Sequence, residues 1–112
     1  MTRVVALVVD LMDRSRLSDT GLDVVFATDI DAAQASARVA PADVVVVDLS
    51  RHDVDLAAVR AAFPDARIVG FGPHVDTERA VDARAAGIDL VLPRSRFFRD
   101  PAAALAIAPE PT

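Results

Sequence analysis

Two short apolar runs, each closed by an aspartate, constrain the fold of this chain most. Residues 4–9 run into Asp10, and residues 44–47 run into Asp48. β-Branched residues without polar alternation are typical of strands covered on both faces, in the middle of a parallel sheet. Parallel strands send both aspartates to the same carboxyl edge, where open α/β sheets bind ligands. These two runs therefore predict the location of a site but not its chemistry.

Strand-like and helix-like segments alternate along the rest of the chain. This alternation predicts a single α/β domain with right-handed crossovers. The flavodoxin-like strand order 2-1-3-4-5 fits best, because the first and third strands are the most apolar and belong at the centre of a five-stranded parallel sheet. We expect the domain to cover residues 1–108 and residues 109–112 to form a frayed tail. The expected strands are 3–9, 22–27, 42–47, 67–71 and 88–92, and the expected helices are 12–17, 31–38, 54–62, 77–86 and 101–108.

Helix-capping residues support these boundaries. An aspartate is a favoured N-cap because its side chain accepts a hydrogen bond from the first turn of the helix. Thr28 or Asp29 is expected to cap the second helix and Asp76 the fourth. Asp100 followed by Pro101 is a strong start signal for the last helix, and Gly87 is a natural end for the fourth.

Composition excludes several classes of function. The formal net charge of −5 argues against nucleic-acid binding, which needs a basic surface. No cysteine is present, so thiolate metal sites and thiol nucleophiles are excluded. No apolar run approaches the roughly 18 residues of a membrane span, and no signal-peptide pattern is seen, so we expect a cytoplasmic protein. All 12 basic residues are arginine, which indicates a GC-rich genome and means that any role usually taken by lysine falls to arginine.

Four features together give the chain a resemblance to a known family. They are Asp10 after the first strand, Asp48 after the third, Ala86-Gly87 at the end of the fourth helix, and Pro93-Arg94 after the fifth strand. The pattern resembles the receiver domain of two-component response regulators, the CheY-like superfamily, over essentially the whole chain. The resemblance implies that Asp48 is the phosphoacceptor, that Asp10 is the first acid of a Mg²⁺-binding pair, and that the partner is a histidine kinase or another signalling protein.

The chain departs from the receiver pattern at three positions. Leu11 stands where the second acid is expected, and Arg94 replaces the lysine. Gly72 falls near the expected Ser or Thr, with no hydroxyl between residues 68 and 75. Asp10 and Asp48 would then bind Mg²⁺ only weakly, because a leucine removes charge and adds an apolar wall. Asp13 could compensate, but it lies one residue past the family position.

Other polar side chains converge on the same edge and suggest an anion site. Arg14 and Ser15 follow the first strand, and Arg94 and Ser95 follow the fifth. Arginines near a sheet edge can bind phosphate or carboxylate groups, although polar loops are also explained by solvation alone. His74 with Asp10 and Asp48 could form a transition-metal site, but a solvated loop histidine explains it more simply.

The leading interpretation is an atypical, degenerate, stand-alone receiver-like module that signals through protein contacts, with impaired phosphotransfer. We expect it not to be an enzyme, because no pair of nucleophile and base can be named. Two alternatives stay open: a genuine phosphoacceptor that uses Asp48, and a small-molecule or anion-binding domain at the carboxyl edge of the sheet. We also expect a homodimer or a partner-dependent complex through the face of the fourth helix, fifth strand and last helix.

Overall fold

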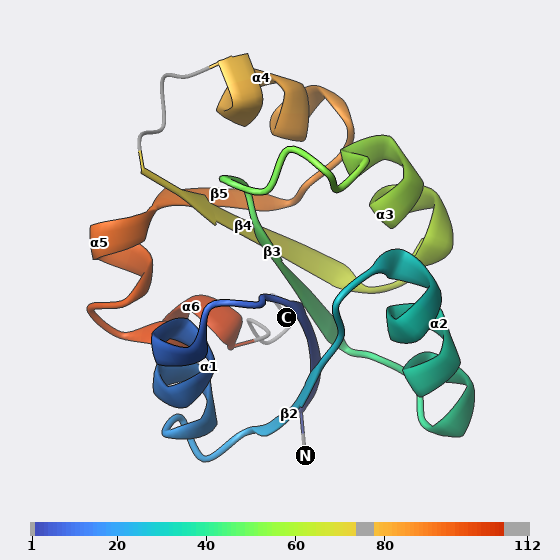
Figure 1. The fold of residues 1–112 in the computed structure, drawn as a ribbon, viewed down its shortest axis with the longest axis vertical. Helices are drawn as coiled ribbons and strands as arrows, with labels where there is room; N and C mark the ends of the chain where they lie inside the picture. Colours follow the sequence, from blue (N-terminus) through green and yellow to red (C-terminus); the bar gives the residue numbers. More distant parts are fainter. Residues whose placement is uncertain (1, 74–77, 107–112) are drawn as a thin grey trace, which may run out of the picture.

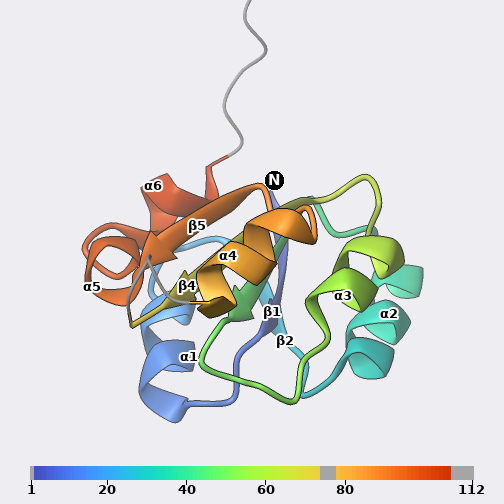
Figure 2. The same cartoon turned by 90° about the horizontal axis from the view of Figure 1, so that it is seen from above.

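Five parallel strands organise the molecule, and helices cover both faces of the sheet (Figures 1 and 2). The computed structural model describes residues 2–73 and 78–106. The strand order is β2-β1-β3-β4-β5, which confirms the predicted flavodoxin-like sheet. The elements in chain order are β1 (Arg3–Leu7), α1 (Leu11–Ser18), β2 (Asp23–Phe26), α2 (Ile30–Val39), β3 (Val44–Asp48), α3 (Leu56–Ala62), β4 (Arg67–Gly72), α4 (Glu78–Ala85), β5 (Leu90–Pro93), α5 (Arg94–Phe97) and α6 (Pro101–Leu105).

Alternate residues of the central strands face two separate cores. Val5 and Leu7 of β1 pack in the core under α2, α3 and α4. Val4 and Ala6, on the opposite face of the same strand, pack in the core under α1, α5 and α6. The sheet thus separates two helical layers, and every residue of β3 is buried between them. This two-sided burial is the reason for the uniformly apolar sequence of the central strands.

Aspartate side chains cap the helices largely as the sequence predicts. Asp29 accepts a hydrogen bond from the Ala32 amide of α2, and Asp100 caps α6 with Pro101 at its first position. Asp55 caps α3 in the same way. The predicted cap Asp76 lies outside the described residues.

The segment after β5 differs from the prediction. The sequence indicates a loop there, but Arg94–Phe97 forms the short helix α5. A helix of one turn has no periodicity that a sequence pattern could reveal. Its last residue, Phe97, is fully buried and stacks on Phe71 of β4 with a centroid separation of 4.8 Å. The adjacent Phe98 contacts both rings edge-on, so three aromatic rings pack α5 and the residue after it against β4.

Two further boundaries differ in a way that bears on the site. β1 ends at Leu7 rather than residue 9, so Asp10 follows the strand by three residues instead of closing it. Asp48, by contrast, is itself the last residue of β3. Within the described residues, no helix has the length and apolar character needed to cross a membrane.

Two glycines with positive φ offer a matched test of the packing. Gly21 has φ of 78° and open space around it, whereas a Cβ at Gly87, with φ of 96°, would lie 2.9 Å from Cδ of Arg60. Arg60 cannot easily move, because its guanidinium donates to the carbonyl oxygens of Phe63 and Ala66, among others.

We expect Gly21→Ala to lower the free energy of unfolding by about 1–2 kcal/mol through backbone strain alone. Gly87→Ala should cost about 1 kcal/mol more, since it adds a steric clash to a similar strain. Urea unfolding of both variants measures the difference. Equal losses would show that Arg60 does not restrict this turn.

Candidate functional site

Asp48 ends β3 in a buried position at the carboxyl edge of the sheet. Its side chain is 6% exposed. Oδ1 of Asp48 accepts hydrogen bonds from the backbone amide of Ser50 (2.9 Å) and from the Ser50 hydroxyl (2.6 Å). The described residues donate no hydrogen bond to the other oxygen, Oδ2. Asp48 is therefore held in one orientation, and its second carboxylate oxygen has no donor among the described residues.

Asp10 has a structural role that the sequence interpretation did not assign to it. Its Oδ1 accepts hydrogen bonds from the backbone amides of Met12 and Asp13, both at 3.0 Å, which makes Asp10 the N-cap of α1. Substitution of an N-cap aspartate typically costs about 1 kcal/mol. Capping thus explains this acid without any ligand, although its Oδ2 has no donor among the described residues.

An ion pair between the buried acid Asp13 and the partly exposed Arg94 dominates the edge. Asp13 lies in the first turn of α1 and is only 1% exposed. The guanidinium of Arg94 approaches both of its oxygens: Nη1 donates to Oδ2 at 2.9 Å, and Nη2 donates to Oδ1. This bidentate geometry is the strongest form of an arginine–carboxylate pair. It joins α1 to α5 across 81 residues of sequence.

Arg94 also interacts with the other groups at this edge. The hydrogen bonds that Arg94 donates to Asp13 raise the pKa of Arg94, and the charges of Asp13, Asp48 and Asp10 raise it further. The guanidinium lies over the rings of Phe71 (5.7 Å to the centroid) and Phe98 (5.0 Å). One fixed cation therefore lies near three carboxylates. This confirms that Asp10 and Asp48 emerge at the same edge of the sheet.

Protein groups already engage most of the acid oxygens that a magnesium site of the receiver kind would use at this edge. Magnesium needs carboxylate and water oxygens in octahedral geometry. Both oxygens of Asp13 face the guanidinium of Arg94, and one oxygen each of Asp10 and Asp48 accepts protein hydrogen bonds. Across residues 2–73 and 78–106, no group of three or more His, Cys, Asp or Glu side chains could hold a metal ion.

The expectation for the position of Leu11, where the receiver pattern has its second acid, was wrong in its details. Leu11 is 79% exposed, so it forms no apolar wall against Asp48. Asp13, which the sequence places one residue too far along, turns inward instead and supplies the buried acid. The alternative metal site that includes His74 lies outside the described residues.

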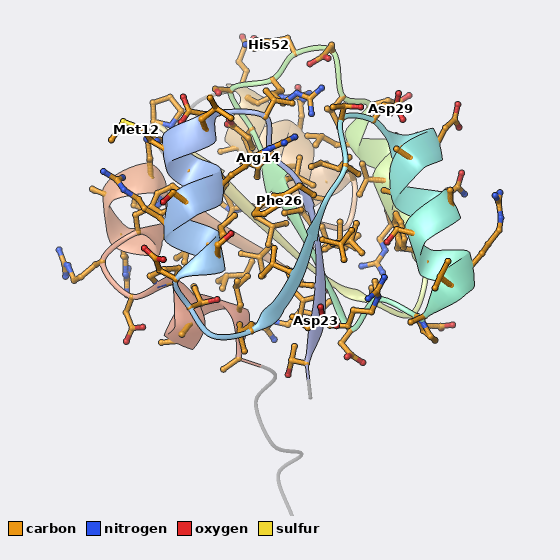
Figure 3. All side chains as sticks on the ribbon, turned by 60° about the horizontal axis from the view of Figure 1, so that its bottom comes forward. Met12, Arg14, Asp23, Phe26, Asp29 and His52 are labelled. Atoms are coloured by element: carbon orange, nitrogen blue, oxygen red, sulfur yellow. The ribbon has the colours of Figure 1, made fainter. Side chains whose placement is uncertain are left out.

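The predicted anion-binding residues separate into two groups. Arg14 donates from Nε to the Val8 carbonyl at 2.7 Å and stacks over Phe26 of β2, as Figure 3 shows, so its guanidinium is already engaged. Ser15 is exposed on α1. Arg94 and Ser95 instead line one open hollow of about 560 Å³ together with Arg16, Phe98 and Arg99. Sequence inspection missed Arg16 and Arg99, because their proximity depends on α5 and α6 lying beside α1.

Arg79, at the start of α4, makes a contact that no sequence pattern indicated. Its guanidinium donates to the carbonyl oxygens of Leu49 (3.2 Å), Arg51 (2.6 Å) and Val54 (2.8 Å). All three acceptors belong to the loop that follows Asp48. The loop is thus tied to α4 through one side chain.

The same loop carries an ion pair between Arg51 and Asp53. Nη2 of Arg51 lies 2.8 Å from Oδ2 of Asp53 and 2.7 Å from the Thr28 carbonyl. The hydrogen bond from Arg51 lowers the pKa of Asp53. Asp53 is therefore an ion-pair partner of Arg51, and the cap of α3 is Asp55.

Comparison with solved structures identifies the fold. CheY4 of Vibrio cholerae is 23% identical, with a TM-score of 0.74 over 94% of this chain and 96% of that one. A response regulator from Burkholderia pseudomallei, solved with a phosphorylated aspartic acid, a calcium ion and citrate, is 22% identical, with a TM-score of 0.71 over 95% of this chain and 67% of that one. RPA3017, a response regulator in red light signaling of R. palustris, is 14% identical, with a TM-score of 0.75 over 100% and 99% of the two chains.

These structures show that the chain has the fold of a CheY-like response regulator receiver domain, as the sequence resemblance predicts. No protein-family model and no curated protein sequence matches the chain. At such low identity the likeness establishes the fold, and the chemistry of the site has to be argued from the residues themselves.

A double-mutant cycle tests the pair between Asp13 and Arg94. Arg94→Met leaves the buried carboxylate of Asp13 without its partner, and we expect a loss of about 2 kcal/mol, less than for a fully buried pair because the Arg94 side chain is 41% exposed. Adding Asp13→Asn should recover part of that loss, so the double variant is more stable than the sum of the single effects predicts.

Chemical unfolding of the four proteins gives the coupling energy. Arg96→Met is the control, because Arg96 lies two residues away in the same helix and is exposed. A coupling energy near zero would mean that the pair contributes nothing beyond its two side chains taken separately.

Proposed function

We propose that this chain is a receiver-type signalling module that acts through protein contacts, and that phosphoryl transfer to Asp48 is impaired in it. The pair between Asp13 and Arg94 is the observation that carries the proposal. It places a fixed guanidinium among the acids at the edge where a phosphoacceptor site would need a divalent cation.

Transfer of a phosphoryl group to an aspartate needs a positive charge that can bind the phosphoryl oxygens as the group arrives. A metal ion supplies this charge when it can exchange its water ligands for phosphoryl oxygens. Arg94 directs both terminal nitrogens at Asp13, so reaching a phosphoryl group on Asp48 would require breaking a bidentate pair and leaving a buried carboxylate unpaired. We infer that this cost slows the reaction.

The residues after β4 support the same proposal. A switch needs a group that senses the modification and changes position. β4 ends at Gly72, and Pro73 follows it, so neither residue offers a hydroxyl to a phosphoryl group on Asp48. Gly72 and Pro73, the described residues at this position, therefore give a modified Asp48 no hydroxyl to read a phosphoryl oxygen.

Binding to a protein partner, rather than catalysis, accounts best for the rest of the site. We propose that the chain is not an enzyme. Arg79 offers a route by which a partner at the loop after Asp48 affects α4, since it bonds to three carbonyl oxygens of that loop. A histidine kinase or another signalling protein is the class of partner we propose. Dimerisation through the face of α4, β5 and the C-terminal helices stays a prediction.

A genuine phosphoacceptor is the second candidate, and one observation favours it. Asp48 is buried at the end of β3, and its Oδ2 accepts no hydrogen bond from the described residues. That oxygen could act as a nucleophile if Arg94 moved to the phosphoryl group.

Intact-mass measurement after incubation with acetyl phosphate and magnesium decides between the two. We expect no stoichiometric phosphoryl adduct on this protein under conditions that label an ordinary receiver domain treated in parallel. Asp48→Asn is the control for labelling at other residues. Full labelling that is lost in the Asn variant would overturn the proposal and establish Asp48 as a phosphoacceptor.

A further inference from the structure

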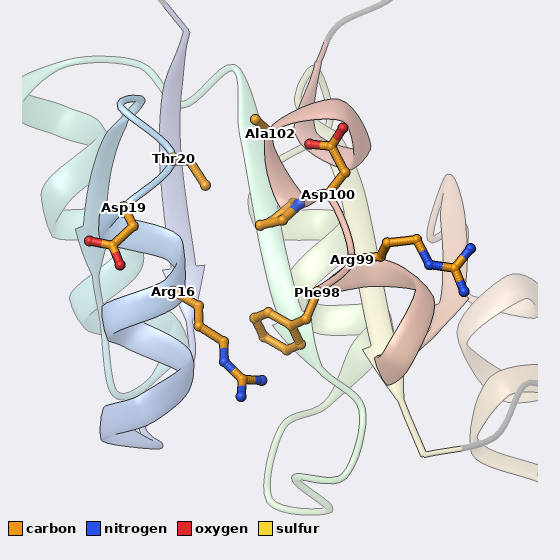
Figure 4. A pocket seen from close by; sticks show the side chains of 8 residues that line it. Arg16, Asp19, Thr20, Phe98, Arg99, Asp100 and Ala102 are labelled. Carbon is orange, nitrogen blue, oxygen red and sulfur yellow. The ribbon is translucent and has the colours of Figure 1, made fainter.

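An arginine-lined hollow lies between α1 and the segment that joins α5 to α6. It measures about 560 Å³, opens to solvent and is lined by Arg16, Arg94, Ser95, Phe98 and Arg99. A second hollow of about 370 Å³ shares Arg16, Phe98 and Arg99 with it and continues toward Thr20 (Figure 4). The two hollows share these three residues and are treated together as one groove, on the side of the sheet that α1, α5 and α6 cover.

The charge of this groove is unusual for the chain. The protein as a whole carries a formal net charge of −5, yet the first hollow is lined by three arginines and no acid. Asp13 compensates Arg94. Arg16 and Arg99 are exposed, and neither forms an ion pair with the described residues. Two positive charges at the groove therefore have no ion-pair partner among the described residues.

Among the described residues, the two acids of the second hollow form no ion pair with Arg16 or Arg99. Asp100 is engaged as the cap of α6, where Oδ1 accepts a hydrogen bond from the Ala103 amide. Figure 4 shows the carboxylate of Asp19 directed away from Phe98. The positive end of the groove is thus the part around Phe98.

Phe98 holds the two nearest guanidinium groups in place. Arg16 lies 5.4 Å and Arg94 lies 5.0 Å from the centroid of its ring. Stacking on an aromatic ring orients a guanidinium and leaves its edge N–H donors available for a ligand. For Arg16 these donors have no partner among the described residues, so they are available to bind an anion.

Arg99 completes the site only after a rotation. Figure 4 shows its side chain extended away from Arg16. Because Arg99 is exposed and makes no ion pair with the described residues, turning it toward the groove costs only side-chain entropy, up to about 2 kcal/mol.

We propose that this groove binds a small ligand through a dianionic phosphate group. Two arginine forks that approach from α1 and from the end of α5, with the Ser95 hydroxyl nearby, match the several oxygens of a phosphate better than a single carboxylate. Phosphate binding in this groove is separate from the proposed signalling function and does not depend on Asp48. Either one can therefore fail while the other holds.

Titration followed by amide chemical shifts tests the site, with inorganic phosphate and phenyl phosphate as the two probes. We expect saturable shifts confined to the segments 14–20 and 94–102. A free phosphate site responds equally to both probes, whereas a site for a phosphate monoester binds phenyl phosphate more tightly. Both results support the proposal. Shifts that rise linearly and are matched by sodium chloride at equal ionic strength would overturn it.

The variant pair Arg16→Gln and Arg99→Gln assigns the binding to these side chains. Removing both should weaken phosphate binding by about tenfold or more, because two charge-assisted contacts are lost. Arg38→Gln is the matched control, since Arg38 is exposed in the last turn of α2 just as Arg16 is in the last turn of α1. Unchanged affinity in the double variant, with circular dichroism showing an intact fold, would also overturn the proposal.

Discussion

The bidentate pair between Asp13 and Arg94 is the interaction on which the functional edge of this molecule depends. It brings a buried acid from the first turn of α1 against a cation from the start of α5. Removing the charge of Asp13 from water costs several kcal/mol, and only a well-aligned partner compensates for it. The aromatic rings of Phe71 and Phe98 beneath the guanidinium help to fix that geometry. A single cation placed in this way determines what the acids around it can bind.

The architecture could be predicted from the sequence because it follows from local patterns. Uniformly apolar strands must be covered on both faces, which places β1 and β3 inside the sheet, and capping aspartates mark helix starts at Asp29, Asp55 and Asp100. The short helix α5 could not be predicted in this way. The stacking of the buried Phe97 ring on Phe71 stabilises this helix, and a contact between such distant segments is not encoded in any local pattern.

The candidate site was predictable only in its location. Parallel strands do bring Asp10 and Asp48 to one edge, near the same guanidinium. Their partners depend on tertiary structure: Asp13 and Arg94 are 81 residues apart. One local signal was available, since an aspartate directly before a helix commonly caps it, and Asp10 could have been interpreted as the N-cap of α1. The contacts of Arg79 with the loop after Asp48 had no such signal.

We propose that Arg94 supplies the positive charge for which a receiver site would use a divalent cation. Thermal unfolding with and without millimolar magnesium tests this role on the parent protein, on Arg94→Gln and on the control Arg96→Gln. We expect magnesium to leave the parent and the control unchanged and to raise the melting temperature of Arg94→Gln, because a ligand that binds only the folded state stabilises it. An equal rise in the parent protein, or no rise in Arg94→Gln, would show that Arg94 does not take the place of the cation.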